Sequence, residues 1–278
     1  RAYQNGLFGT EKPMDLAFMS GIYRSEQFPP NDPWLSGYSI SYYYFGYVMA
    51  AMLSKLSGVW TTIGYNMHIA MLFALTGLAS FGVTYNLIRS RAFRFVRAGE
   101  FIRNDNASPQ RLALGFGVLG AVFVILMGNF QAPLVEYPYN TGTASDAYLD
   151  FWDMNGRWEP VPEGVGSDDV ARWDNWWWFK GARTISDQNL LDPDVFSRDQ
   201  LHVEAIAEFP QFSFLLADSH PHVMTLPYVL LAIGIALNVL LIGQAPDTMR
   251  VIFYGICVGA LVFLNTWDTP IYIMAVLG

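Results

Sequence analysis

Long apolar runs alternate with polar segments along the chain, and the apolar runs contain almost no charged residues. Tyr65–Ile88 and Val223–Gly243 are each long enough to cross a bilayer, which takes about 20 helical residues. Leu112–Met127 is shorter but uncharged, Val251–Leu264 is also uncharged, and Asp268–Gly278 starts another apolar run. The pattern therefore predicts an all-α, multi-pass transmembrane helical protein with spans in these segments.

The segment Ser41–Ser57 is apolar on one side only. As a helix of 17 residues it would be about 25 Å long, short of the hydrocarbon core of about 30 Å. We therefore expect it to lie in the membrane interface, and a short tilted span is the alternative. The apolar stripe has the i, i+3, i+4, i+7 spacing of one helix face and consists of Phe45, Val48, Met49, Met52, Leu53 and Leu56.

The distribution of charge predicts which side of the membrane each loop faces. Six arginines lie from Arg89 to Arg111, opposed only by Glu100 and Asp105, so the positive-inside rule places this loop in the cytoplasm. The next loop, Gln131–His222, carries 16 acidic residues against 5 lysines and arginines, and we expect it on the extracytoplasmic side. If Ser41–Ser57 is interfacial, residues 1–60 face the extracytoplasmic side as well.

The chain then divides into four segments. We expect residues 1–60 to form an extracytoplasmic loop with interfacial helices, and residues 61–130 to form two spans joined by the basic loop. Residues 131–222 are an acidic, tryptophan-rich extracytoplasmic loop, and 223–278 contain further spans. Because the chain starts with arginine and stops inside an apolar run, we expect a fragment of a longer protein of the plasma membrane.

Composition agrees with a membrane protein and excludes other classes. Charged residues make up 14% of the 278 residues, against about 25% in soluble domains, and mean hydropathy is +0.24. The net charge of -8 disfavours nucleic-acid binding, which needs a basic face. The single Cys257 cannot form a disulfide within the chain.

Two polar clusters carry residue types that can do chemistry. Pro13 suits the first turn of a helix and Thr10 is a candidate cap, so Asp15 would lie near a helix start at the membrane surface. A carboxylate there either takes part in chemistry or stabilises the helix dipole.

The second cluster consists of Asp218, His220 and His222, beside a span that Pro221 would start. These side chains are candidate ligands of a divalent metal ion, an anion or substrate site at the helix start, or a structural cap. Residues two apart on a helix do not share a face, so the histidines converge only if the segment around Pro221 is non-helical.

Six motifs occur together in this order from residue 11 to residue 268. They are Glu11-Lys-Pro-Met-Asp15, Asp32-Pro-Trp34, Tyr42-Tyr-Tyr-Phe-Gly46, Glu208-Phe-Pro210, Asp218-Ser-His-Pro-His222 and Asn265-Thr-Trp-Asp268. In this combination the chain resembles the YYY-motif family of bacterial and archaeal multi-pass membrane proteins, which is uncharacterised and resembles the C-type (GT-C) membrane glycosyltransferases. Ser219 departs from the apolar residue expected at its position.

This resemblance implies a glycosyltransferase that moves a sugar from a lipid-phosphate carrier to an acceptor on the extracytoplasmic face. Asp15 would be the catalytic base, and Asp218, His220 and His222 would hold a divalent metal ion or the donor phosphate. The implied substrate-binding residues are Lys12, Arg24, Glu208 and Asp268. An ordinary interfacial role for Asp268, and surface ion pairs for Lys12 and Arg24, are the alternatives.

The tryptophan-rich region also allows two interpretations, because flat aromatic faces stack on sugars but also favour membrane interfaces. It contains Trp152, Trp158, Trp173, Trp176, Trp177 and Trp178. The alternative function is a non-catalytic structural or accessory subunit of a larger membrane complex. A transporter ranks lower, because the middles of the spans lack charged residues. The expected partners are a lipid-linked sugar donor, membrane lipids and subunits of such a complex, and no nucleic acid.

Overall fold

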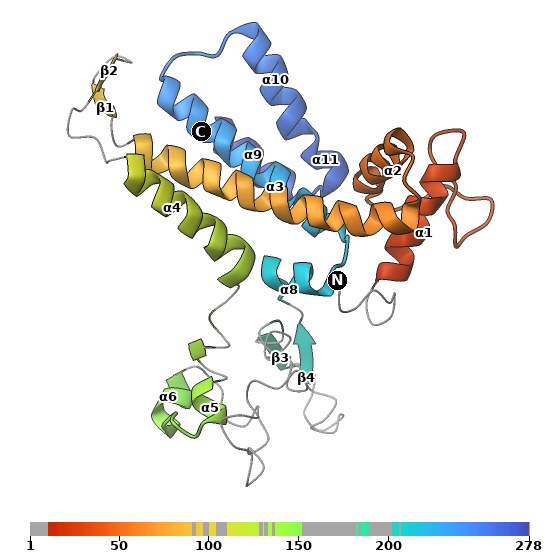
Figure 1. Cartoon of the computed structure of the whole chain (residues 1–278), viewed down its shortest axis with the longest axis horizontal. Coiled ribbons are helices and arrows are strands. Elements are labelled where there is room, and N and C mark those ends of the chain that lie inside the picture. Colours follow the sequence, from red (N-terminus) through yellow and green to blue (C-terminus); the bar gives the residue numbers. More distant parts are fainter. Residues whose placement is uncertain are drawn as a thin grey trace. The chain divides into compact units, whose positions relative to one another are not determined.

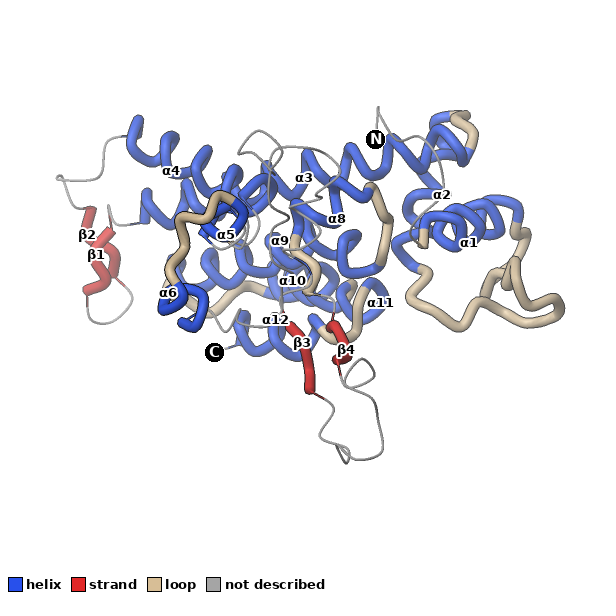
Figure 2. The backbone as a smooth tube through the Cα atoms, turned by 90° about the horizontal axis from the view of Figure 1, so that it is seen from below, coloured by secondary structure: helices blue, strands red, loops and turns tan. Residues whose placement is uncertain are grey.

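The computed structural model describes residues 11–90, 93–96, 100–103, 110–127, 130, 133–134, 137–151, 182, 185–188, 202–205 and 207–277. The chain forms two compact units. The first consists of Arg1–Leu126 together with Ser213–Gly278, and the second of Met127–Phe212. Most of the described residues lie in helices, both in the long apolar segments and in the part of the chain before them (Figures 1 and 2). The predicted all-α class is confirmed.

The first unit begins with two short helices, α1 (Lys12–Arg24) and α2 (Phe45–Ser57). Pro13 lies in the first turn of α1, as predicted, but the N-cap position is Glu11. The proposed cap Thr10 lies outside the described residues. A left-handed Gly58, with φ 69°, ends α2 and lets the chain turn into the next helix.

Helix α2 packs through the face opposite its apolar stripe. Tyr47, Ala50 and Ala51 are buried against Phe18 and Met19 of α1. The second half of the stripe points outward: Met52, Leu53 and Leu56 are 50%, 41% and 78% exposed. With 13 residues α2 is about 20 Å long, too short to cross a bilayer. An apolar outer face on so short a helix supports the interfacial interpretation.

Three helices are long and apolar enough to cross a membrane. They are α3 (Thr61–Ser90), α4 (Gln110–Val122) with its π-helical continuation η1 (Phe123–Met127), and α9 (Pro221–Ile242). Each contains the span predicted from the apolar pattern to within a few residues. Pro221 starts α9, as its missing N–H favours.

Helices α3 and α4 are neighbours that pack through small residues. A Cβ added at Gly117 would lie 2.7 Å from the ring of Phe81, and one at Gly120 would collide with Thr84. The two backbones therefore approach closely, as small residues permit between membrane helices. Between these helices, β1 (Phe93–Val96) and β2 (Glu100–Arg103) form an antiparallel hairpin.

The expected span Val251–Leu264 lies within one apolar helical segment, Thr248–Leu264. It consists of α10 (Thr248–Gly259) and α11 (Leu261–Leu264), joined at Ala260. Ala260 itself has helical φ and ψ of -60° and -25°, and its N–H bonds to the carbonyl of Ile256 at 3.0 Å, so the helical path continues through it. The segment lies with α12 (Asp268–Leu277) among the shorter apolar helices. Ala232 and Ile235 of α9 pack with Val258 and Leu261, which ties this part to the spans.

The second unit contains α5 (Tyr137–Asn140), α6 (Asp146–Phe151) and an antiparallel hairpin of β3 (Ile185–Gln188) and β4 (His202–Ala205). The chain returns to the first unit within α8 (Pro210–Leu216). The tryptophan-rich region falls outside the described residues, so its role stays a prediction. The tryptophans of this region are Trp152, Trp158, Trp173, Trp176, Trp177 and Trp178.

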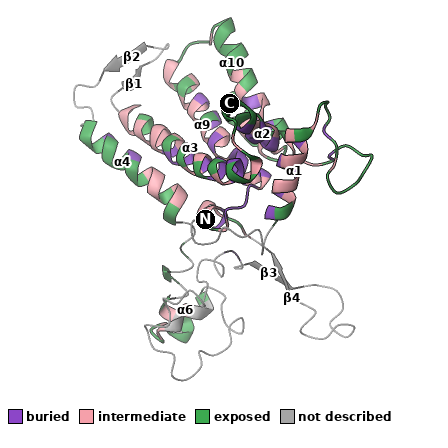
Figure 3. Cartoon of the chain, turned by 45° about the vertical axis from the view of Figure 1, so that its right-hand side comes forward, coloured by how far each residue is buried: buried purple, intermediate pink, exposed green. Residues whose placement is uncertain are grey.

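The buried part of α3 lies toward its start. All of its buried residues fall between Gly64 and Ser80, and the start of the helix lies beside α1 and α2 (Figure 3). Phe263 of α11 also lies against Phe45 of α2, with ring centroids 5.9 Å apart. The starts of α3 and α9, the two short helices and the end of α11 therefore meet in one region.

Candidate active site around Asp15

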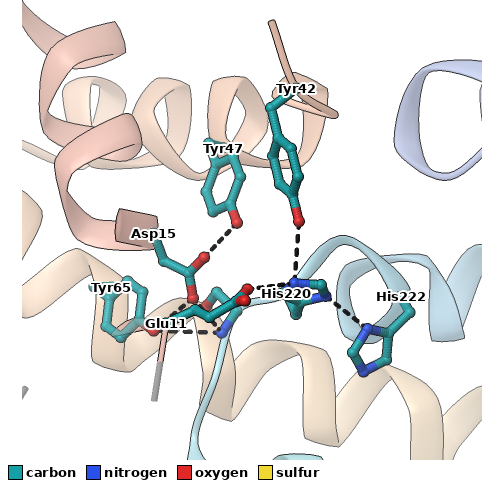
Figure 4. A network of polar contacts seen from close by, with 8 residues as sticks. Glu11, Asp15, Tyr42, Tyr47, Tyr65, His220 and His222 are labelled. Atoms are coloured by element: carbon teal, nitrogen blue, oxygen red, sulfur yellow. Dashed lines mark hydrogen bonds and ion pairs between the residues drawn. The ribbon is translucent and has the colours of Figure 1, made fainter. Parts of the chain in front are cut away.

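The side chain of Asp15 joins three separate parts of the first unit. It is completely buried, and its two oxygens accept hydrogen bonds from different segments (Figure 4). Tyr47 of α2 donates its hydroxyl to Oδ1 at 2.5 Å, and the backbone N–H of Ser219 donates to Oδ2 at 3.0 Å. The hydroxyl of Tyr65 in α3 lies 3.2 Å from Oδ2. We call Asp15, Tyr47, Tyr65, Asp218 and Ser219 the Asp15 cluster.

Local structure explains why Ser219 reaches Asp15. Residues 218–220 belong to no helix or strand, and the preceding Ala217 has a left-handed φ of 56°. This turn separates α8 from α9 and points the N–H of Ser219 at the carboxylate. Tyr65 also lies 3.4 Å from the carbonyl of Ala217, so it binds both sides of the turn.

A second carboxyl group adjoins the first. The side chains of Asp15 and Asp218 are within hydrogen-bonding reach. Burial, together with this neighbour, raises the pKa of Asp15 to about 8, although the hydrogen bonds from Tyr47 and Tyr65 act in the opposite direction. The raised pKa favours the protonated form of Asp15 at neutral pH. In the described part of the chain, Oδ1 of Asp218 is buried without a hydrogen bond.

The two histidines converge beside the Asp15 cluster. Nδ1 of His220 lies 2.8 Å from Nδ1 of His222. They meet because His220 is the extended N-cap of α9, with φ -61° and ψ 150°, and is not yet helical. The histidines are expected to converge only if the segment around Pro221 is non-helical. His220, one residue before the proline, meets this condition.

The other nitrogen of His220 faces an acid. Its Nε2 lies 2.5 Å from Oε2 of Glu11 and 3.0 Å from the hydroxyl oxygen of Tyr42. Because an ionised carboxylate only accepts, we assign a proton to Nε2 of His220. In the neutral pair, Nδ1 of His220 then accepts from Nδ1–H of His222. Glu11 thereby determines which nitrogen of each ring carries the hydrogen.

The described arrangement is not a ready metal site. Among the residues that the structure describes, no group of three histidine, cysteine, aspartate or glutamate side chains could hold a metal ion. The facing Nδ1 atoms of His220 and His222 lie 2.8 Å apart, at hydrogen-bond distance, whereas two nitrogens that each lie about 2.0 Å from one tetrahedral zinc ion are about 3.3 Å apart. Metal binding by Asp218, His220 and His222 stays a prediction, and no chemical step below uses a metal.

The predicted cationic residues lie at different distances from the cluster. Lys12 is 2% exposed and lies three residues before Asp15, on the same side of α1. Arg24 is exposed, about 14 Å further along the helix axis and on the opposite face. The structure therefore brings Lys12 near Asp15 and leaves Arg24 at the other end of the helix.

The two predicted acidic residues lie in different parts of the chain. Asp268 starts α12 and accepts a hydrogen bond from Asn265 at 3.0 Å, in the turn that follows α11. Glu208 is exposed and belongs to the second unit. Substrate binding by Glu208 and Asp268 stays a prediction.

Sequence reasoning missed four residues of this site. Glu11 and Tyr42 lie inside quoted motifs, but nothing in the sequence gave them a contact with His220. Tyr47 carried a weak signal, because it is a polar residue off the apolar stripe of α2. Tyr65, at the start of an apolar run, looked like an ordinary interfacial aromatic residue.

The Asp15 cluster and the arginine loop lie at opposite ends of α3. Tyr65 contacts Asp15 near the start of the helix, whereas Arg89 lies in its last turn, about 36 Å further along the axis. Asp15 and His220 share one end of the membrane helices, as the sidedness argument requires. The assignment of that end to the extracytoplasmic side stays a prediction.

Comparison with known proteins identifies the family. A family model described as "Uncharacterized membrane protein (DUF2298)" matches residues 1–278. No curated protein and no solved structure matches the chain. The match agrees with the three candidate spans and with the resemblance to an uncharacterised membrane family. The chain therefore belongs to the DUF2298 family of uncharacterised membrane proteins.

Proposed function

We propose that this protein is a membrane glycosyltransferase that moves a sugar from a lipid-phosphate carrier to an acceptor on the extracytoplasmic face. One observation carries the proposal. A buried carboxylate, a second acid and a histidine pair, from positions about 200 residues apart, meet where two candidate spans begin. Converging titratable groups at a membrane surface suit chemistry on a lipid headgroup.

The proposed reaction is a substitution at the anomeric carbon. The acceptor hydroxyl oxygen forms a bond to this carbon while the bond to the carrier phosphate breaks. The phosphate leaves with the electron pair, and ionised Asp15 takes the hydroxyl proton. A raised pKa makes the ionised form of Asp15 a stronger base, and the adjoining Asp218 favours positive charge at the sugar.

The histidine pair and the start of α9 suit the donor phosphate. The side chain of His220 is 28% exposed, so it can be reached from solvent, whereas Asp15 is enclosed. An imidazolium ring and the positive end of a helix dipole both favour an anion. Lys12 adds a positive charge one turn from Asp15. In this arrangement the donor binds at the histidines, and the acceptor reaches Asp15 after the cluster opens.

The test is transfer of a labelled sugar from polyprenyl phosphate by membranes containing the protein. Asp15→Asn keeps the shape of the side chain but removes the base, and we expect a loss of about 100-fold or more. Asp247→Asn is the matched control, because Asp247 caps α10 at the other end of the spans and asparagine caps equally well. Turnover of Asp15→Asn at the level of the control would refute the role of the base.

The complete burial of Asp15 also favours the alternative, a non-catalytic subunit in which the carboxylate ties helices together. That function predicts stoichiometric co-purification with other membrane proteins and no sugar transfer. It also predicts that His220→Ala leaves the amount of assembled complex unchanged, since the histidine pair then has no substrate to bind.

A further inference from the structure

We propose that the groove between α3 and α9 binds an anionic phospholipid. Its hydrocarbon chains lie along the groove, and its phosphate lies at the end nearest the arginine loop. This site is separate from the Asp15 cluster, and the proposal does not depend on sugar transfer.

The groove is large and apolar along most of its length. Its volume is about 510 Å³, within the range of about 300–1,000 Å³ of small-molecule sites. It extends along Leu75–Asn86 of α3 and Pro227–Leu241 of α9, both of them candidate spans. Hydrocarbon chains are therefore the molecules that surround its open side.

Two glycines keep the groove open. A Cβ added at Gly82 would meet nothing within 4 Å among the described residues, and one at Gly234 would meet only Val83 at 3.8 Å. These glycines differ from Gly117 and Gly120, whose missing side chains admit a neighbouring helix. At Gly82 and Gly234 the space is available to a ligand.

The groove becomes polar at one end. Asn86 and Asn238 line it there, at the carboxyl ends of their helices. Tyr254 donates its hydroxyl to Oδ1 of Asn238 at 2.7 Å, which leaves the NH₂ group of Asn238 as a donor. Arg89 follows Asn86 by one helical turn on the same face. An amide and a guanidinium together match the oxygens of a phosphodiester.

Charge complementarity favours an anionic phospholipid over an apolar helix as the molecule that fills the groove. The segment from Arg89 to Arg111 carries six arginines against Glu100 and Asp105, so its end of the spans attracts anionic headgroups. A third helix in the groove would use the apolar walls but would gain nothing from Arg89.

The first experiment fills the groove. The whole protein is placed in nanodiscs of phosphatidylcholine with phosphatidylglycerol, and bound phosphatidylglycerol is counted by native mass spectrometry. We expect Gly82→Leu to lower the bound amount at least about fivefold, since its side chain occupies the site. Gly115→Leu is the matched control on α4, where an added Cβ also meets nothing within 4 Å of the described residues, and it should retain the lipid.

The second experiment removes the charge and does not disturb helix packing. Arg89→Gln should lower the preference for phosphatidylglycerol over phosphatidylcholine about fivefold, the equivalent of about 1 kcal/mol for one arginine. Lys55→Gln, an exposed cation on α2, should leave the preference unchanged.

Three results would overturn the proposal. Equal binding of the two lipids by the wild type would exclude an anionic site. An Arg89→Gln variant with unchanged preference would exclude the placement of the phosphate. Loss of a second copy or of another bound protein from Gly82→Leu, with lipid binding unchanged, would assign the groove to a protein helix.

Discussion

The two halves of α3 are held by different kinds of contact. Near its start, Tyr65 joins a buried polar cluster whose members come from α1, α2 and the segment before α9. Toward its end, Phe81 and Thr84 fit against Gly117 and Gly120 of the next helix in the chain. The first contact depends on hydrogen bonds between distant segments, and the second on close approach of consecutive helices.

The difference separates chemistry from packing. Small residues between spans stabilise a helix pair through dispersion and need no titratable group. A buried carboxyl group is costly unless donors surround it, as they do here, and a buried titratable group with a perturbed pKa is typical of functional sites. The start of α3 is therefore where we expect function, and its second half is where we expect structural stabilisation and lipid contact.

The largest effect is expected from Asp15→Ala. This change removes the acceptor of the Tyr47 hydroxyl, leaves Tyr65 and the N–H of Ser219 with only longer contacts of 3.4 and 3.3 Å, and creates a cavity. At about 1–3 kcal/mol for each unsatisfied group, we expect the free energy of unfolding to fall by about 3–5 kcal/mol. Equilibrium unfolding in detergent micelles measures this free energy. A loss below about 1 kcal/mol would mean that the polar cluster does not hold this end together.

The second effect is on the pH dependence of stability. Burial raises the pKa of Asp15 from 3.8 to about 8, so the folded protein binds this proton more tightly than the unfolded chain does. The stability that this proton on Asp15 contributes is complete below about pH 4 and is lost as pH rises through about 8. The unfolding free energy should therefore decrease with pH in this window, by at most about 1.4 kcal/mol per pH unit.

Asp15→Asn gives the control for this pH dependence, because its amide does not titrate. The difference in unfolding free energy between wild type and variant should change in favour of the variant between pH 5 and pH 8. A constant difference over this range would show that Asp15 is already ionised when buried.

The third effect concerns the other half of α3. Gly120→Leu places a side chain where Thr84 already lies, and overpacking of this kind costs about 1–3 kcal/mol. Gly115→Leu, on an exposed part of α4, should change stability by less than about 0.5 kcal/mol. Equal stability of the two variants would contradict close packing of α3 on α4.

The packing half was easier to predict than the polar half. The apolar run Tyr65–Ile88 predicted α3 to within a few residues, and Pro221 marked the start of α9. These features are local, because apolar length and a missing N–H act within one helix. The run Val251–Leu264 likewise lies within the helical segment Thr248–Leu264.

For the polar half of α3, the sequence predicted only that the polar residues lie at the same end of the spans. Charge asymmetry between loops placed Asp15 and His220 at one end of the spans, and the structure brings them together there. Their partners could not be predicted, because a tyrosine hydroxyl in an apolar helix finds its acceptor only after the helices pack. The turn at Ala217, which aims Ser219 at Asp15, has no sequence signal such as a glycine.

The smallest effect returns to the polar half. Tyr47→Phe removes one hydroxyl that donates to Asp15, and one buried hydrogen bond contributes about 1 kcal/mol. This hydroxyl also lowers the pKa of Asp15, so its loss should raise that pKa further. Stability of the variant should then fall more steeply than that of the wild type as pH approaches 9. Tyr38→Phe, in an exposed loop, is the matched control and should follow the wild-type curve. If Tyr47→Phe also followed that curve, Tyr47 would be a packing residue, and the contrast between the two halves of α3 would weaken.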